Sequence, residues 1–371
     1  MAKMDIFAAT VEHFLGPILP FMRDPQVSEI MINAPGEIYI EKSGQLVKTE
    51  ASFENEDALM AAVNNVLQYT GKRVTIEHPL IDSRLPDGSR VHVILGPLCR
   101  TGTCMTIRKF AKVMFSADHL VELGSWTPLA REYLEMCVLA EKNVLVAGGT
   151  SSGKTCLLNV LSHFLPNHQR IVVIEDSAEL ELQQDHVISL ESRPPDRWGR
   201  GEVGIRELFR SSLRLRPDRI IIGECRGGEA LDMIQAMTSG HAGSMSTLHA
   251  NMAMDALNRL ETLAMMSKIE LPLHALRAQI ASAIDVVIQM TRFTDGRRGL
   301  TQVCEVLPLS DDGHYRLQEL FTYQLDEGGH ARDGHGQLQW TGIKSIFRKE
   351  PKMRILKERW DLTEKLFEAD T

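Results

Sequence analysis

A glycine-rich turn carries the clearest chemical signal in the sequence. The segment Asn143–Leu161 reads NVLVAGGTSSGKTCLLNVL, which is an apolar strand, a loop and the start of an apolar helix. The loop has the spacing Gly148-x-x-x-x-Gly153-Lys154-Thr155, the pattern of a phosphate-binding loop when it joins a strand to a helix. The alternative is a glycine turn with a chance lysine, and the flanking strand and helix disfavour it.

Each residue type in this loop has a chemical reason. The glycines let consecutive N–H groups converge on a β-phosphate at the positive end of a helix. Lys154 is expected to bridge β- and γ-phosphate oxygens, and the hydroxyl of Thr155 to bind Mg²⁺. ATP is therefore the expected substrate and Mg²⁺ the expected cofactor. The expected nucleotide-binding residues are Gly148, Gly149, Thr150, Ser151, Ser152, Gly153, Lys154, Thr155 and Cys156.

Two later strands end in acids. RIVVIEDSAEL (170–180) reaches Glu175, and RIIIGECRGGEA (219–230) reaches Glu224. Ligand sites in open α/β sheets lie at the carboxyl ends of such strands. We expect Glu224 to polarise the attacking water and Glu175 to hold Mg²⁺ or that water. A lone acid after a strand is usually a helix cap, but two such strands after one phosphate loop favour a catalytic role.

Two histidines occur in MTSGHAGSMSTLHAN (237–251). Ser244–Ala250 reads as a further strand after a helix at 227–238, so His249 ends a core strand. There it can donate an N–H to a γ-phosphate and report its presence. We expect the same sensor role for His241. A satisfied core histidine is one alternative. A zinc pair is another, but it lacks a third ligand at close spacing.

Composition limits the class of protein. The 371 residues suffice for two domains, with 43% hydrophobic and 24% charged residues. A net charge of −8 argues against a general nucleic-acid binder. No apolar run approaches the ~18–20 residues of a membrane span, and the N-terminus is a poor signal peptide. The scattered cysteines, with no C-x-x-C pair, indicate a reduced, cytoplasmic protein.

The pattern of predicted strands and helices divides the chain into four parts. Residues 1–110 predict a smaller α+β domain with short strands at 29–34, 37–42, 44–50, 90–96 and 104–110 and a helix at 55–71. Residues 111–127 form a connector. Strand and helix alternation over 128–328 predicts a RecA-like P-loop domain of α/β class, with a parallel-rich sheet and an appended hairpin at 299–309 and 315–325. Residues 329–371 are a C-terminal extension.

Two groups of arginines need an explanation. The stretch from Arg193 to Arg219 is most simply a loop and a solvated amphipathic helix at 205–215, since a nucleic-acid surface needs more interleaved aromatics. Arg84, Arg90 and Arg108 lie in the N-terminal domain, which has no phosphate loop of its own. We expect them to reach the γ-phosphate bound by the other domain or by a neighbouring subunit, as arginine fingers do.

Four motifs in order carry a family resemblance. GGTSSGKT, IEDSAEL, RPDRIIIGECRGGEALDMIQAM and GHAGSMSTLHAN resemble the Walker A, Asp box, Walker B and His box of the type II/type IV secretion ATPase superfamily. The stretch from 226 to 251 is most similar to CpaF-type ATPases of Tad (Flp) pilus systems. The N-terminal segments resemble that family's first domain. Ser151 replaces a common glycine, and the four-cysteine zinc module typical of the type II branch is missing.

The resemblance implies a function. It implies a homo-hexameric, Mg-dependent ATPase motor with its nucleotide between two domains. Such a motor is cytoplasmic, associates peripherally with the inner membrane through a polytopic platform protein, and drives assembly or retraction of a pilus. A conjugation-type type IV secretion ATPase stays as the alternative. A helicase is disfavoured by the acidic charge, and a non-hydrolysing scaffold by the presence of Lys154, Glu224 and His249 together.

Overall fold

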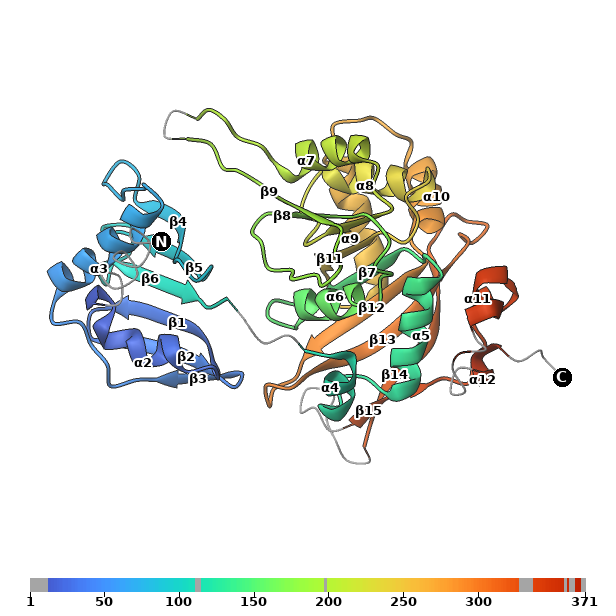
Figure 1. The fold of residues 1–371 in the computed structure, drawn as a ribbon, viewed down its shortest axis with the longest axis horizontal. Coiled ribbons are helices and arrows are strands. Elements are labelled where there is room, and N and C mark those ends of the chain that lie inside the picture. Colours follow the sequence, from blue (N-terminus) through green and yellow to red (C-terminus); the bar gives the residue numbers. More distant parts are fainter. Residues whose placement is uncertain are drawn as a thin grey trace. The chain divides into compact units, whose positions relative to one another are not determined.

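The computed structural model describes residues 13–110, 115–196, 199–326, 336–356, 359 and 364–367. The chain forms two compact units, residues 1–113 and 114–371, and each is described by itself. Figure 1 shows their elements. Among the described residues no helix has the length and apolar character that a bilayer span requires.

The first unit is one antiparallel sheet with a helix. Its strand order is β3-β2-β1-β6-β5-β4. The strands are β1 (Val27–Ala34), β2 (Glu37–Lys42), β3 (Gln45–Lys48), β4 (Leu80–Arg84), β5 (Arg90–Ile94) and β6 (Cys104–Arg108), with helices Gly16–Ile18 (3₁₀), α2 (Leu19–Arg23) and α3 (Glu56–Tyr69). Asn55 caps α3 through the amide of Ala58, and Gly71, at φ +69°, ends it. The expected strands and helix are confirmed, and β4 is an addition.

The second unit holds a nine-stranded mixed sheet of order β15-β14-β13-β12-β7-β11-β10-β8-β9. Six neighbouring strands are parallel: β12 (Val286–Arg292), β7 (Val144–Gly148), β11 (Met245–His249), β10 (Arg219–Ile222), β8 (Ile171–Glu175) and β9 (Val187–Glu191). The antiparallel edge consists of β13 (Arg298–Leu307), β14 (Arg316–Leu325) and β15 (Gly336–Trp340). This confirms the predicted α/β class and the hairpin.

Helices cover both faces of this sheet, which explains why its central strands are apolar throughout. Val144 and Val146 of β7 face the side of α5 (Pro128–Leu139) and α6 (Lys154–Ser162). Leu145 and Ala147 face the side of α7 (Ile205–Ser212), α8 (Glu229–Thr238), α9 (Ala253–Met265) and α10 (Leu273–Ala283). The 3₁₀ turn Leu213–Leu215 continues α7. The result is a three-layer arrangement.

Both ends of the second unit pack onto the sheet. Helix α4 (Ala117–Glu122) lies within the expected connector, and its Leu120 joins the core under α5. The described part of the expected extension contributes β15, the 3₁₀ helix Ile346–Lys349, α11 (Pro351–Leu356) and α12 (Glu364–Phe367). Buried Glu305 fixes this tail, because its carboxylate accepts hydrogen bonds from the Ile346 amide at 2.9 Å and from the Ser345 hydroxyl.

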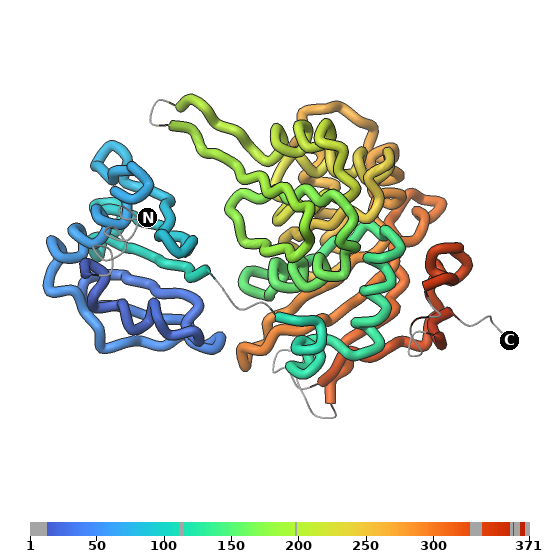
Figure 2. The backbone as a smooth tube through the Cα atoms, viewed as in Figure 1, coloured from blue at the N-terminus to red at the C-terminus, as the bar shows by residue number. Residues whose placement is uncertain are grey.

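An arm leaves the sheet between β9 and α7. The backbone runs outward after Ser192 and returns, with Arg193 paired antiparallel to Val203 (Figure 2). The helix that follows buries Phe209 and Ser212, while Arg206 and Arg210 both bond to Asp232 of α8. This agrees with the expected amphipathic helix on the surface of the domain.

Candidate active site

The phosphate-loop motif forms a tight turn between β7 and α6. Gly153 has φ +96° and directly precedes the first helical residue, Lys154. A Cβ on Gly148 would collide with the Ser152 hydroxyl and would lie 2.6 Å from the carbonyl oxygen of Met290. Only glycine fits at both positions, because one needs the left-handed region and the other a close approach of backbone. The predicted strand–loop–helix is confirmed.

Ser151 adopts a backbone conformation that favours glycine, with φ +56°. A left-handed conformation costs an L-residue about 1–2 kcal/mol. The loop is held in place by Arg298 of β13, whose Nε donates to the carbonyl oxygen of Ser151 at 2.8 Å. The Ser152 hydroxyl donates to the carbonyl of Gly149 at 2.9 Å. Arg298 was not predicted, since it lies far along the chain and matches no motif.

The remaining loop residues differ in exposure. Gly149 and Thr150 are exposed, so a phosphate can approach their backbone. Thr155 lies half-buried in the first turn of α6. Cys156 follows it, and burial raises the pKa of its thiol to about 11. The thiol is therefore neutral near pH 7 and acts as a small packing group.

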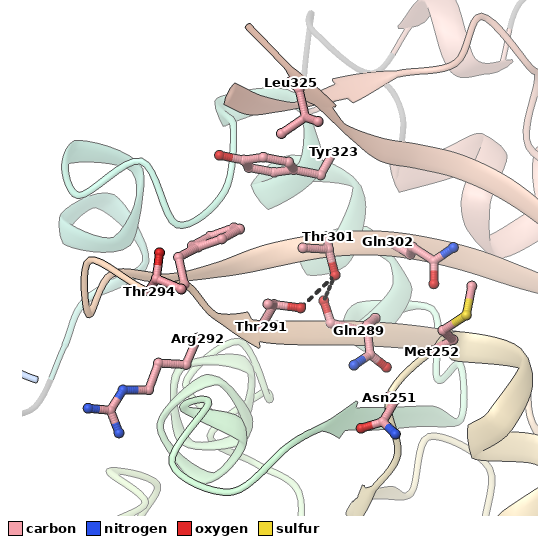
Figure 3. A pocket seen from close by; sticks show the side chains of 11 residues that line it. Asn251, Met252, Gln289, Thr291, Arg292, Thr294, Thr301, Gln302, Tyr323 and Leu325 are labelled. Carbon is pink, nitrogen blue, oxygen red and sulfur yellow. Dashed lines mark hydrogen bonds between the residues drawn. The ribbon is translucent and has the colours of Figure 1, made fainter. Parts of the chain in front are cut away.

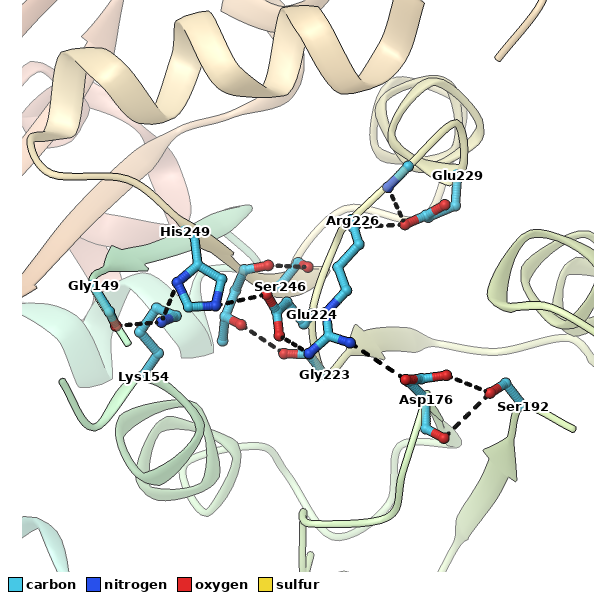
Figure 4. Close-up of polar contacts among 12 residues, drawn as sticks. Gly149, Lys154, Asp176, Ser192, Gly223, Glu224, Arg226, Glu229, Ser246 and His249 are labelled. Carbon is cyan, nitrogen blue, oxygen red and sulfur yellow. Dashed lines mark hydrogen bonds and ion pairs between the residues drawn. The ribbon is translucent and has the colours of Figure 1, made fainter. Parts of the chain in front are cut away.

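Lys154, His249 and Glu224 meet at the carboxyl ends of three neighbouring strands (Figure 4). The Nζ of Lys154 donates to the Gly149 carbonyl at 2.7 Å and lies 3.4 Å from Nδ1 of His249. Nε2 of His249 lies 3.0 Å from Oε1 of Glu224. One imidazole thus connects the phosphate-loop lysine to the expected catalytic carboxylate, as the parallel order β7-β11-β10 requires.

The electrostatic surroundings disfavour a charged His249. Burial is the largest cause that lowers its pKa, and the ammonium of Lys154 adds to it, while Glu224 acts in the opposite direction. A neutral imidazole has one N–H to donate and one nitrogen to accept. Such a group can exchange its partner when a phosphate arrives.

Glu175 ends β8 and is buried at 4% exposure. Its Oε1 accepts hydrogen bonds from the amides of Glu179 at 2.9 Å and Leu180 at 3.1 Å. Gly223 permits this placement, since a Cβ there would lie 2.9 Å from Cγ of Glu175. The carboxylate therefore sits at the same edge as Glu224, bound to the backbone that follows its own strand.

The expected Mg²⁺ ligands are few. Among the described residues no group of three histidine, cysteine or acidic side chains is placed to hold a metal ion. Mg²⁺ usually keeps several waters and takes one or two protein oxygens together with substrate phosphates. The half-buried hydroxyl of Thr155 and the carboxylate of Glu175 are oxygen donors of this kind, so the donor set fits that mode of binding.

His241 lies before the amino end of β11, opposite to His249, so the structure does not support the sensor role expected for it within one chain. It precedes β11, whose first residue pairs with Val144 and whose last, His249, pairs with Gly148. The five residues of β11 span about 13 Å from the first to the last. The Ser244 hydroxyl donates to the His241 carbonyl at 2.8 Å. His241 is therefore not brought to the phosphate loop of its own chain.

The three arginines of the first unit are neighbours. Arg84 of β4 pairs with Arg90 of β5, and Arg90 pairs with Arg108 of β6. We call these residues the arginine row. Paired residues in antiparallel strands share a face, and like charges placed so close repel each other. Glu29 of β1 faces Arg108 and offsets part of this charge.

A pocket of about 550 Å³ is lined by residues of β12, β13 and β14 and by Asn251 and Met252 (Figure 3). Its lining combines the aromatic pair Phe293 and Tyr323, with centroids 5.0 Å apart, with polar groups. The amide of Gln289 donates to the Ala250 carbonyl at 3.2 Å, which ties this pocket to the residue after His249. No prediction covered this pocket.

Comparison with known proteins decides the family. The family model described as "Type II/IV secretion system protein" matches residues 12–331. The chain belongs to this family. The type IV secretion system protein PtlH of Bordetella pertussis is 36% identical over 310 residues, covering 76% of this chain and 91% of PtlH. The predicted superfamily is thereby confirmed.

Solved structures show the same fold. The ATPase DotB of Legionella pneumophila superposes with a TM-score of 0.54 at 20% identity, over 81% of this chain and 82% of that one. The pilus retraction motor PilT with bound ADP gives 0.55 at 19% identity, over 82% and 84%. The chain therefore shares the fold of these two proteins, as predicted.

Proposed function

We propose that this protein is a Mg-dependent ATPase motor of a type IV machine, working as a homo-hexamer that assembles or retracts a Tad-type pilus. The observation that carries the ATP-hydrolysing role is the Lys154–His249–Glu224 contact, which joins a phosphate-loop cation to a carboxylate through one neutral imidazole. Strain in the loop and its support by Arg298 indicate a binding site that is formed before the nucleotide arrives.

Each residue then has a role. Lys154 and the loop amides bind the phosphates, and Thr155 with Glu175 would hold Mg²⁺, which supplies charge neutralisation there. Glu224 accepts a proton from the attacking water. His249 releases Lys154 and turns its one N–H from Glu224 to the γ-phosphate. The arginine row supplies positive charge to the transferring phosphoryl group from its own or a neighbouring subunit.

A motor of this kind must act on other proteins of the machine. We propose that it acts at the cytoplasmic side of the inner membrane, where it binds a polytopic platform protein, and that nucleic acid is not its substrate. The resemblance of residues 226–251 to CpaF-type ATPases supports the role in pilus assembly or retraction. The identity with PtlH favours a second candidate, an ATPase that drives substrate transfer through a type IV secretion channel.

A complementation experiment separates the two candidates. A deletion strain is supplied with the wild-type gene or with Lys154→Ala, and surface pili and secretion or DNA transfer are measured in the same cultures. Restoration of pili by the wild type alone, with transfer unchanged throughout, supports the pilus motor. Loss and recovery of transfer with pili unchanged would establish the second candidate instead.

A further inference from the structure

Arg226 connects two acids that the catalytic mechanism above leaves unconnected. It follows Glu224 by two residues, in the loop between β10 and α8. Its Nη2 lies 2.7 Å from Oε2 of Glu224, and its Nη1 lies 3.3 Å from Oδ2 of Asp176 (Figure 4). A guanidinium presents its donors in a rigid planar fork, so it can bond to two carboxylates at once.

Both ends of this bridge are held. The backbone amides of Arg226 and Gly227 donate to Oε1 of Glu229, at 2.7 and 2.8 Å, and Glu229 is 7% exposed at the start of α8. At the other end, Oδ1 of Asp176 accepts a hydrogen bond from the hydroxyl of Ser192 at 2.6 Å. The guanidinium is therefore fixed by the fold at its backbone and at its second carboxylate.

Arg226 holds one oxygen of Glu224, and the other becomes available to the attacking water when His249 turns to the γ-phosphate. Oε2 bonds to Arg226, while Oε1 faces Nε2 of His249 at 3.0 Å. A carboxylate held by only one oxygen would rotate about its side-chain bonds and would sample positions from which it could not reach the water. Restricting a catalytic group to its productive geometry is a large part of rate enhancement.

We propose that Arg226 is a positioning residue for ATP hydrolysis, which orients Glu224 by bridging it to Asp176. This inference rests on the proposed role of Glu224. The Arg226 side chain is 54% exposed and lies outside the apolar core, so its removal leaves the packing of the second unit intact. Its effect is expected in the chemical step rather than in folding or nucleotide binding.

Steady-state ATP hydrolysis of the full chain tests this with a set of variants. Arg226→Gln is expected to lower kcat by roughly 10- to 100-fold, while KM for ATP and the Kd for ADP stay within about twofold. Arg226→Lys should recover part of kcat, because an ammonium can pair with one carboxylate but cannot bridge two. Arg316→Gln, an exposed arginine at the start of β14, is the matched control and keeps normal kcat.

A double-mutant cycle tests the bridge itself. Asp176→Asn is expected to lower kcat less than Arg226→Gln, and the double variant should be about as slow as Arg226→Gln alone. Additive losses would overturn the bridge, as would an unchanged kcat in Arg226→Gln or an equal loss of ATP and ADP binding. Glu224→Gln is measured alongside. If it is slow while Arg226→Gln is normal, this inference fails alone, whereas a normal Glu224→Gln removes the proposed function of Glu224.

Discussion

Nε2 of His249 lies 3.0 Å from Oε1 of Glu224, and the opposite ring nitrogen lies 3.4 Å from the Lys154 ammonium. In this arrangement one imidazole contacts both Lys154 and Glu224. An arriving γ-phosphate competes for Lys154 and offers His249 a new acceptor. We therefore expect the third phosphate to draw the N–H of His249 away from Glu224, which ADP, with only its β-phosphate near Lys154, cannot do.

His249→Ala tests this directly. The contact with the γ-phosphate is absent from the ADP complex, so the Kd for ADP should change by less than about twofold, while kcat falls. This pattern is expected when an interaction strengthens in the transition state. Calorimetric titration with ADP and a coupled hydrolysis assay measure the two quantities. Equal weakening of ADP and ATP binding would mean that His249 only supports the loop.

The lowered pKa of His249 predicts a pH effect on stability. The unfolded chain takes up this proton near the ordinary pKa of 6.5, and the folded chain only at lower pH. The free energy of unfolding should therefore decrease as the pH falls below 6.5 and should be unaffected above it. The His249→Asn variant has no side chain that can take up this proton. Between pH 8 and pH 5.5 the Tm of the wild type should fall further than the Tm of the variant. Equal decreases in Tm would contradict the lowered pKa of His249.

Ser151→Gly should relieve strain in the phosphate loop. Glycine adopts φ +56° without steric cost but loses more entropy on folding, so the unfolding free energy should rise by at most about 1 kcal/mol. A more mobile loop should also release ADP faster, as followed with a fluorescent analogue by stopped flow. Ser43→Gly is the matched control, since Ser43 has φ +50° in the β2–β3 turn. Faster release in both variants would exclude a local effect.

The arginine row should act on hydrolysis and not on binding. Arg90→Ala and Arg108→Ala are each expected to bind ATP within about threefold of wild type but to hydrolyse it at least ~10²-fold more slowly, since a finger meets charge that develops in the transition state. Exposed Arg100→Ala serves as the control. Normal hydrolysis in both row variants would remove the finger role.

Mixing variants then shows which subunit provides the arginine. Lys154→Ala should bind no nucleotide, because the loop loses the lysine of its phosphate cradle. Mixed with Arg108→Ala, it should rebuild some complete sites if the row acts between subunits. Activity that never exceeds the sum of the two parents, with oligomers verified by light scattering, would restrict the row to its own chain.

The sequence predicted what depends on local pattern. Short apolar strands, the end of α3 at Gly71 and the glycine positions of the phosphate loop all follow from residue type and spacing. Three of the strands that were not predicted, β4, β9 and β15, lie at sheet edges, whereas a fourth, β12, lies inside the second sheet. An edge strand buries few side chains, so it lacks the apolar pattern by which a strand is recognised.

The site was predictable to the extent that its residues follow strands. Glu175, Glu224 and His249 were found because parallel strands bring their carboxyl ends together. His241 does not reach the phosphate loop of its own chain, because it precedes β11 whereas His249 ends that strand, and a sequence motif alone does not show this. Arg226 and Arg298 were missed, since their roles arise from side-chain contacts across the sheet.

The central claim is that Glu224, held beside His249 and Lys154, assists the attack of water on bound ATP. Glu224→Gln keeps the size of the side chain and removes its basicity. Single-turnover hydrolysis with enzyme in excess, together with ATP affinity measured by calorimetry, tests the claim most directly. The account predicts ATP affinity within about threefold of wild type and a rate at least ~10²-fold lower. A wild-type rate in this variant would contradict it.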